Sequence, residues 1–201
     1  MSSEIVIKQG TLPRRDAVAA ILAHRDGALV VTGLGSPSYD LHAAGDRDDN
    51  YYLWGAMGGA ALVGLGLAQA QPTRRVLVIT GDGEQLMAFG GLATIAVARP
   101  KNLTIVVIDN HHYGETGMQV SHTGRGIDLA KVAEVCGFAA SATLRSIAEV
   151  EDVGRTLNQP SDGPRLYVIK VTAENPSRSL PSRDAVFIKN RFRKHLGFAA
   201  G

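Results

Sequence analysis

The sequence has a single cysteine, Cys136, among its 201 residues. One cysteine excludes a disulfide within the chain, and it cannot hold an iron–sulfur cluster or a structural zinc ion without other ligands nearby. No apolar run is long and uncharged enough to span a bilayer, and the opening stretch MSSEIVIKQG has neither the basic start nor the apolar centre of a signal peptide. We therefore expect a cytoplasmic protein with no membrane attachment.

A long basic tract is also missing. The 21 Lys and Arg residues nearly balance 19 Asp and Glu residues, and only the stretch KNRFRKHLG is locally positive. Such a stretch is more often the solvated face of a helix than a nucleic-acid contact, so we expect no nucleic-acid partner. Repeats and low-complexity linkers are absent as well. The length predicts one domain over residues 1–201, with residues 176–201 as a helical C-terminal extension.

Predicted strands and helices alternate along the chain. Short apolar runs rich in β-branched residues predict strands at 28–31, 75–80, 103–109 and 165–173. Helical spacing of apolar residues predicts helices at 15–26, 56–71, 85–98, 127–137, 146–159 and 183–196. Residues 32–41 are expected to form a loop. The predicted fold class is α/β, a three-layer open sheet of mainly parallel strands flanked by helices.

Asp82 and Asn110 follow two consecutive predicted strands. A right-handed crossover makes such strand ends neighbours, and open α/β sheets bind ligands at this edge. Carboxylate and amide oxygens are ligands for Mg²⁺, while Gly81 and Gly83 would let a phosphate group approach the backbone. The pair therefore predicts a Mg²⁺ ion that anchors a diphosphate. Taken singly, Gly-Asp-Gly and Asp-Asn are also ordinary turn sequences after strands.

The two motifs, separated by residues 84–108, resemble the signature of the thiamine diphosphate enzymes. The resemblance extends through GSPS, YYLWGAMG, LATIAVARPKNL and YGETGMQVSHT. In these stretches the chain is similar to the thiamine diphosphate-dependent decarboxylases, in particular to the beta, cofactor-binding subunit of sulfopyruvate decarboxylase and to the C-terminal domain of phosphonopyruvate decarboxylase. It implies the thiamine diphosphate-binding fold, in its diphosphate-binding form.

The resemblance also implies a set of site residues. Mg²⁺ would be bound by Asp82, by the Asn110 side chain and by the main-chain carbonyl of His112. The Gly55 carbonyl would accept a hydrogen bond from the aminopyrimidine, and Met57 would lie beneath the cofactor, although a methionine in an apolar helix is usually a core residue. The diphosphate would be surrounded largely by backbone N–H groups of Gly35, Ser36, Gly83, Glu84, Tyr113, Gly114 and Glu115.

A partner follows from the same resemblance. In this family a glutamate on a separate pyrimidine-binding domain activates the cofactor, and the residues before Asp82 are too few to contain that domain. We expect an alpha subunit to carry this glutamate, in a hetero-oligomer with at least two copies of each subunit. YYLWGAMG would line an exposed apolar face for it. The implied reaction is conversion of sulfopyruvate, a small anionic 2-oxo acid, to sulfoacetaldehyde and CO₂.

Other functions stay open. Phosphonopyruvate decarboxylase and acetolactate synthase-like carboligases share the cofactor domain, and a scaffold or regulatory subunit could retain the fold. His111 and His122 are candidate proton carriers, although His111 and His112 are more readily explained as a solvent-facing pair. Glu115 stands where these relatives have a small hydroxyl residue. Its carboxylate would disfavour a diphosphate unless it points away or meets a cation.

Overall fold

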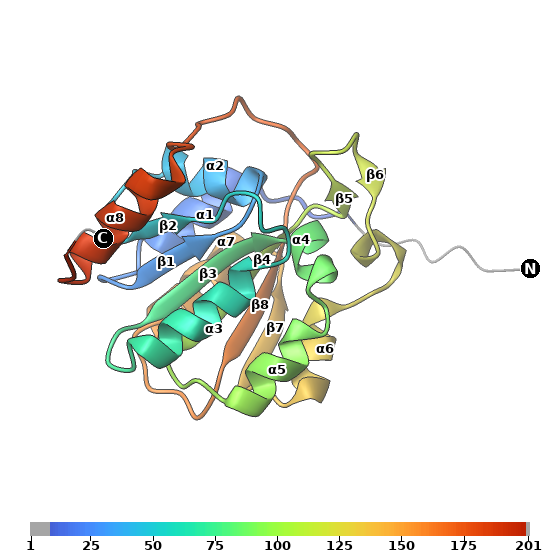
Figure 1. The fold of residues 1–201 in the computed structure, drawn as a ribbon. Coiled ribbons are helices and arrows are strands. Elements are labelled where there is room, and N and C mark those ends of the chain that lie inside the picture. The colour runs from blue at the N-terminus through green and yellow to red at the C-terminus, as the bar shows by residue number, and fades with distance from the viewer. Residues whose placement is uncertain (1–8, 200–201) are drawn as a thin grey trace, which may run out of the picture.

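The computed structural model describes residues 9–199, in which six parallel strands form one sheet in the order β2-β1-β3-β4-β8-β7 (Figure 1). The predicted domain, 1–201, and the predicted C-terminal extension, 176–201, both include residues outside this range. Most of the opening stretch MSSEIVIKQG, which lacks the features of a signal peptide, also lies outside it. The strands are β1 (Leu29–Thr32), β2 (Asn50–Tyr52), β3 (Val76–Gly81), β4 (Leu103–Asp109), β7 (Ala140–Leu144) and β8 (Arg165–Lys170).

Helices cover both faces of the sheet, so the predicted three-layer α/β fold is confirmed (Figure 1). One face packs against α1 (Arg14–Leu22), α2 (Ser36–Ala43) and α7 (Ile147–Thr156). The other packs against α3 (Ala60–Ala70), α5 (Gly91–Ala98) and α6 (Leu129–Cys136). The last helix, α8 (Ala185–His195), packs near β2 and places Ile188 in the first core and Phe192 in the second.

Four short elements lie near the carboxyl ends of the central strands. Helix α4 (Asp82–Met87) begins directly after β3. Strands β5 (His112–Tyr113) and β6 (Gln119–Val120) form an antiparallel hairpin after β4, followed by a 3₁₀ turn, η1 (Thr123–Arg125). Among residues 9–199, no helix combines the length and apolar character needed to cross a membrane.

Local details differ from the sequence-based expectation. The expected loop at 32–41 is wrong from Ser36 onward, because Gly35 turns the chain with φ of +87° and Pro37 lies in the first turn of α2. The helix expected at 85–98 is two helices, α4 and α5, separated by residues 88–90. Strands β2 and β7 were not predicted. They are the two edge strands, and the small and hydroxyl side chains of β7 do not form an apolar run.

The topology explains where a ligand can bind. The chain leaves β1 into α2 on one face of the sheet and leaves β3 toward α5 on the opposite face. The connections after these two neighbouring strands therefore run to opposite faces of the sheet. In open α/β sheets, a reversal of this kind opens a crevice that takes the ligand.

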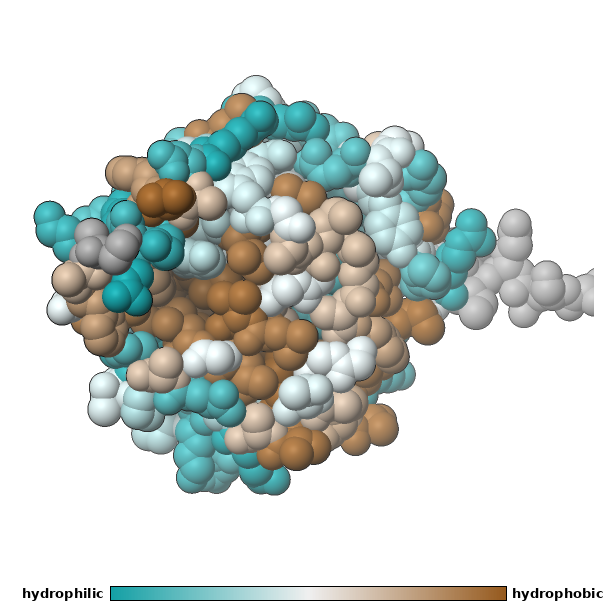
Figure 2. All heavy atoms as spheres, viewed as in Figure 1, coloured by the Kyte–Doolittle hydropathy of each residue, from teal (hydrophilic) through white to brown (hydrophobic). Residues whose placement is uncertain are grey.

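The predicted apolar face is only partly exposed. Within YYLWGAMG, Tyr52 is buried, whereas the Met57 side chain is 57% exposed. Other large apolar side chains near α3, α4 and α5 are also open to solvent, namely Leu62, Met87, Phe89 and Val97. Figure 2 shows apolar surface gathered over the face that carries α3, between α8 and α5.

The centre of β4 provides a test of the core. The side chain of Ile105 is fully buried, and its register partners are Val78 in β3 and Leu166 in β8. Ile105→Ala should lower the free energy of unfolding by about 2–5 kcal/mol, and Ile105→Val by about 0.5–1.5 kcal/mol, because each deletion leaves a cavity. Denaturant unfolding measures both losses. Val97→Ala, at an 87% exposed position, is the control; a loss as large as that of Ile105→Ala would contradict this packing.

Candidate functional site

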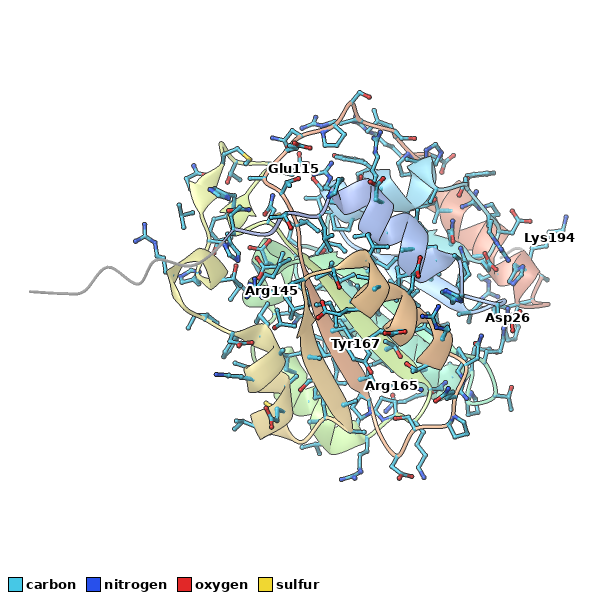
Figure 3. The ribbon with its side chains drawn as sticks, turned by 180° about the vertical axis from the view of Figure 1, so that it is seen from behind. Asp26, Glu115, Arg145, Arg165, Tyr167 and Lys194 are labelled. Carbon is cyan, nitrogen blue, oxygen red and sulfur yellow. The ribbon has the colours of Figure 1, made fainter. Side chains whose placement is uncertain are left out.

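The loops after β1, β3 and β4 surround one pocket at the carboxyl edge of the sheet. Its volume is about 770 Å³, including the part open to solvent. Figure 3 shows Glu115, one of its lining residues, at the opposite end of the sheet from Arg165, the first residue of β8. The lining residues are Arg14, Leu34, Ser36, Pro37, Met57, Gly81, Asp82, Gly83, Glu84, Met87, Ile108, Asn110, His112, Tyr113, Gly114, Glu115 and Thr116.

Close backbone approach shapes this pocket. A Cβ atom added at Gly83 would lie 2.7 Å from Cδ1 of Tyr113, so only glycine lets the turn after β3 pack against the Tyr113 ring. At Gly35 the positive φ disfavours any side chain. The glycines on both sides of the crevice therefore bring main chain, rather than side chain, to the ligand position.

Asp82 presents a buried carboxylate at the end of β3. Its Oδ2 accepts hydrogen bonds from Ser121 Oγ at 2.6 Å and from Thr123 Oγ1 at 3.0 Å, and the residue is only 2% exposed. Burial, and then the nearby charge of Asp109, raise the pKa of Asp82 to about 6. Within residues 9–199, no cationic side chain forms an ion pair with it. A bound cation would favour the charged carboxylate.

Asp109, the last residue of β4, has a cation of its own. Lys170, its register partner at the end of β8, forms a buried ion pair with Asp109 Oδ2. The other oxygen accepts a hydrogen bond from the His111 backbone N–H at 2.9 Å. It also lies 2.8 Å from Thr123 Oγ1, whose single hydrogen is shared between Asp109 and Asp82. His111 Nε2 lies 2.9 Å from Lys170 Nζ, and burial lowers the pKa of this imidazole. These contacts fix the start of the loop after β4.

Asn110 lies beside Asp82 in the pocket wall. Its Oδ1 accepts the His112 backbone N–H at 3.0 Å, and its main-chain carbonyl lies 2.8 Å from His112 Nδ1. The side-chain oxygen is therefore held in place by the loop. Among the described residues, no three His, Cys, Asp or Glu side chains gather to hold a metal ion, so a site here would depend on one carboxylate, one amide oxygen and main-chain oxygens.

The carboxylate of Glu84 lies next to Gly33, the residue that follows β1. Its Oε2 accepts a hydrogen bond from Thr80 Oγ1 at 2.9 Å, and backbone N–H groups of Leu34, Gly58 and Ala60 favour its charged form. Burial outweighs these donors and raises the pKa of Glu84. The carboxylate fills the space that a side chain at Gly33 would need.

Glu115 meets a cation. Arg178 Nη2 donates to Glu115 Oε2 at 3.0 Å, and the Arg178 guanidinium carbon lies 5.5 Å from the centre of the Tyr39 ring. Arg178 belongs to the connecting segment, residues 172–184, which arches from β8 to α8 over the carboxyl end of the sheet (Figure 1). The expected conflict between this carboxylate and a bound anion is thus reduced by a neighbouring positive charge.

Most of the predicted site residues lie together. Ser36, Met57, Asp82, Gly83, Glu84, Asn110, His112, Tyr113, Gly114 and Glu115 all line the pocket, and Gly35 lies beside Ser36. Gly55, His111 and His122 are not among the lining residues. The solvent-facing reading of His111 is wrong, since this residue is 3% exposed. His122 is exposed, and its Nδ1 lies 2.7 Å from the Tyr113 hydroxyl.

Four polar residues near the site were not predicted. Ser121 and Thr123 hold Asp82, Lys170 neutralises Asp109, and Arg14 lines the pocket. Lys170 left a signal, because a lysine inside an otherwise apolar strand must find a buried partner. The hydroxyl residues left none, because the fold of the hairpin brings them back to Asp82.

Known proteins resemble this chain over the part that contains Asp82 and Asn110. The model of the family "Thiamine pyrophosphate enzyme, C-terminal TPP binding domain" matches residues 39–171. The chain is 38% identical over 169 residues to the sulfopyruvate decarboxylase subunit beta of Methanocaldococcus jannaschii, covering 84% of this chain and 88% of that protein. It is 42% identical over 147 residues to the phosphonopyruvate decarboxylase of Streptomyces viridochromogenes, covering 73% of this chain and 36% of that protein.

A solved structure shares the fold. The benzoylformate decarboxylase of Polynucleobacter necessarius superimposes with a TM-score of 0.69 at 18% identity, over 85% of this chain and 36% of the other. The chain therefore spans about a third of that longer protein. At this level of identity the likeness concerns the fold.

The buried Lys170–Asp109 pair allows a stability test. Lys170→Met should lower the free energy of unfolding by about 3–5 kcal/mol, because it leaves the Asp109 carboxylate buried without its cation. Denaturant unfolding at neutral pH measures the loss. Lys101→Met is the matched control, since Lys101 approaches Asp162 at only 3.8 Å and both side chains are largely exposed. Equal effects of the two variants would show that the buried pair does not stabilise the loop after β4.

Proposed function

This chain belongs to the thiamine pyrophosphate enzymes, in the family of the sulfopyruvate decarboxylase beta subunits, and we propose that it is the cofactor-binding subunit of a two-subunit 2-oxo acid decarboxylase. The proposed substrate is sulfopyruvate, and the proposed products are sulfoacetaldehyde and CO₂. The proposal draws on the names of these relatives and on one structural observation. Asp82 and Asn110 lie in the same pocket, and the Asp82 carboxylate has no cationic partner among the described residues.

The donor set fits Mg²⁺ and a diphosphate. Mg²⁺ takes hard oxygen ligands, and it is commonly bound by one or two protein oxygens together with phosphate oxygens and water. We assign Asp82, the Asn110 side-chain oxygen and the His112 main-chain carbonyl to the metal. The remaining predicted contacts, in the loops after β1, β3 and β4, would hold the diphosphate.

The bound cofactor supplies the electron sink that allows a 2-oxo acid to lose CO₂. The residues of this chain bind and orient it. Met57 projects from the loop before α3 and lines the pocket while 57% exposed, which suits a side chain that supports a ligand rather than a core. Ser121 and Thr123 both contact Oδ2 of Asp82, and they would orient its carboxylate for a bound metal ion.

A second candidate substrate is phosphonopyruvate. The 42% identity to a phosphonopyruvate decarboxylase favours it, and both acids carry an anionic tail beyond the keto group. A carboligase of the acetolactate synthase type and a scaffold subunit are further alternatives. A pocket with a buried, unpaired carboxylate argues against the scaffold, because a scaffold gains nothing from that unfavourable burial.

We also propose an alpha subunit as partner. Relatives of this chain are named subunit beta, a name that implies an alpha subunit. In our proposal the alpha subunit carries the activating glutamate and covers the exposed apolar side chains around Met57 and α4. A complex with two or more copies of each subunit is the expected assembly.

Removing the metal ligand tests the proposal. Calorimetric titration of thiamine diphosphate with Mg²⁺ into the complex with the alpha subunit should show binding that is lost in Asp82→Ala, together with CO₂ release from sulfopyruvate. The variant should stay folded, because it removes a carboxylate that burial and Asp109 both disfavour. Asp162→Ala, at an exposed position, is the control. Full activity in Asp82→Ala would remove the metal assignment, and no binding by the wild-type complex would favour the scaffold.

The Glu115–Arg178 pair gives a second test. Arg178→Met should weaken thiamine diphosphate binding about two- to tenfold, because Glu115 then repels the diphosphate without a neighbouring cation. Glu115→Gln should bind at least as tightly as wild type, and the double variant should return close to wild type. Titration of the cofactor gives all three affinities.

Arg183→Met is the matched control for this cycle. Arg183 lies in the same connecting segment, it is exposed, and its loss changes the net charge by the same amount. If Arg183→Met and Arg178→Met weaken binding equally, the effect is one of overall charge. Identical affinities in every variant would place Glu115 away from the diphosphate.

A further inference from the structure

We propose that Arg14 binds an oxyanion group of the molecules that enter the pocket, an inference that rests on the proposed function. Arg14 begins α1, which lies beside α2 (Figure 1), and it lines the pocket although the residue is only 4% exposed. No prediction from the sequence included it.

The guanidinium of Arg14 is held from two sides. Its Nη1 donates to Ser36 Oγ at 2.6 Å, and its Nε lies 2.9 Å from Asp40 Oδ2. An arginine has five N–H donors in a rigid plane, a geometry suited to phosphate, sulfonate and carboxylate oxygens. Within residues 9–199, Ser36 and Asp40 are its hydrogen-bonding or ionic side-chain partners, which leaves donors available for a ligand.

The local charge favours an anion. Asp40 is completely buried and is shared by two cations, Arg14 at 2.9 Å and Arg15 at 3.4 Å. One carboxylate balances only one of the two guanidinium groups. Arg15 is 32% exposed and also donates to the Ser177 carbonyl at the surface. The cluster therefore keeps an excess positive charge, and Arg14 is its member in the pocket wall.

Few other positive charges lie around the pocket, whereas several acidic residues line it. Three acidic residues, Asp82, Glu84 and Glu115, line the pocket. Among the described lining residues, Arg14 alone carries a permanent positive charge. A diphosphate or a doubly anionic substrate needs cationic or N–H partners here. A metal at Asp82 would offset part of the negative charge, and Arg14, at the start of α1, would offset more.

The hydrogen bond to Ser36 sets the direction of a second donor. Because Ser36 Oγ accepts from Arg14, its own O–H must point to another acceptor. Arg14 and Ser36 thus present two donors at the start of α2, next to Gly35. A ligand oxyanion placed there would accept from both.

The test compares two adjacent arginines. Arg14→Met should lower the affinity for one oxyanion-bearing ligand about tenfold or more, a loss in the range of a charge-assisted hydrogen bond. Arg15→Met removes the same charge from the same Asp40 but lies outside the pocket wall, and it should change affinity less than about twofold. Equal effects of Arg14→Met and Arg15→Met would overturn the proposal.

Two measurements identify the oxyanion. Titration of thiamine diphosphate, and separately of inorganic pyrophosphate, into the complex with Mg²⁺ reports on the diphosphate. The ratio of the KM for sulfopyruvate to the KM for pyruvate reports on the anionic tail of the substrate. A loss confined to the first identifies the cofactor as the source, and a loss confined to the second identifies the substrate. No change in either measurement contradicts the proposal.

A paired variant guards against misfolding. Arg14→Met leaves Asp40 with Arg15 as its remaining cation, so Arg14→Met/Asp40→Asn removes both charges together and should fold as judged by circular dichroism and thermal unfolding. It should show the same loss of oxyanion affinity. Wild-type affinity in this variant would overturn the proposal. Failure of the proposed function is distinguished by the wild-type complex, which would then not bind thiamine diphosphate at all.

Discussion

Parallel pairing between β3 and β4 determines where the polar residues of the pocket lie. The register joins Val76 to Leu103 and continues to Gly81 and Ile108, so the two strands end together. Asp82 follows β3, while Asp109 is the last residue of β4 and Asn110 follows it. A shift of the register would separate Asp82 from Asn110 and turn the side chains of β4 to the opposite face. The buried side chains on both faces hold this register in place.

The acidic residues in and near the pocket have different partners. Asp109 does not line the pocket; its side chain is fully buried and has Lys170 as its partner, so the charge pair is satisfied inside the protein. Asp82 lines the pocket and has hydroxyl side-chain partners only, which leaves its charge to be balanced by what binds. Glu115 is at the rim and meets Arg178. The unpaired acid thus stands where the proposed metal would be.

The sequence predicted those parts of the molecule that depend on nearby residues. The apolar β-branched runs marked β1, β3, β4 and β8, and the Gly-Asp-Gly and Asp-Asn turns placed Asp82 and Asn110 at one edge of the sheet. Strand β7 has no such run, and its pairing with β8 depends on tertiary contacts. Arg14 is also out of reach of local patterns, because its role comes from Ser36 and Asp40, which lie on the next helix.

The carboxylate of Glu84 occupies the volume left free by the missing side chain of Gly33. The two positions are far apart in sequence, and each limits what the other can be. A larger residue at 33 would displace the Glu84 carboxylate or favour a shorter residue at 84, and either change would release Thr80 and the backbone donors around Gly58. Substitutions at these two positions should therefore be correlated among homologous chains. The size of the residue at position 33 would vary together with the presence of a carboxylate at position 84.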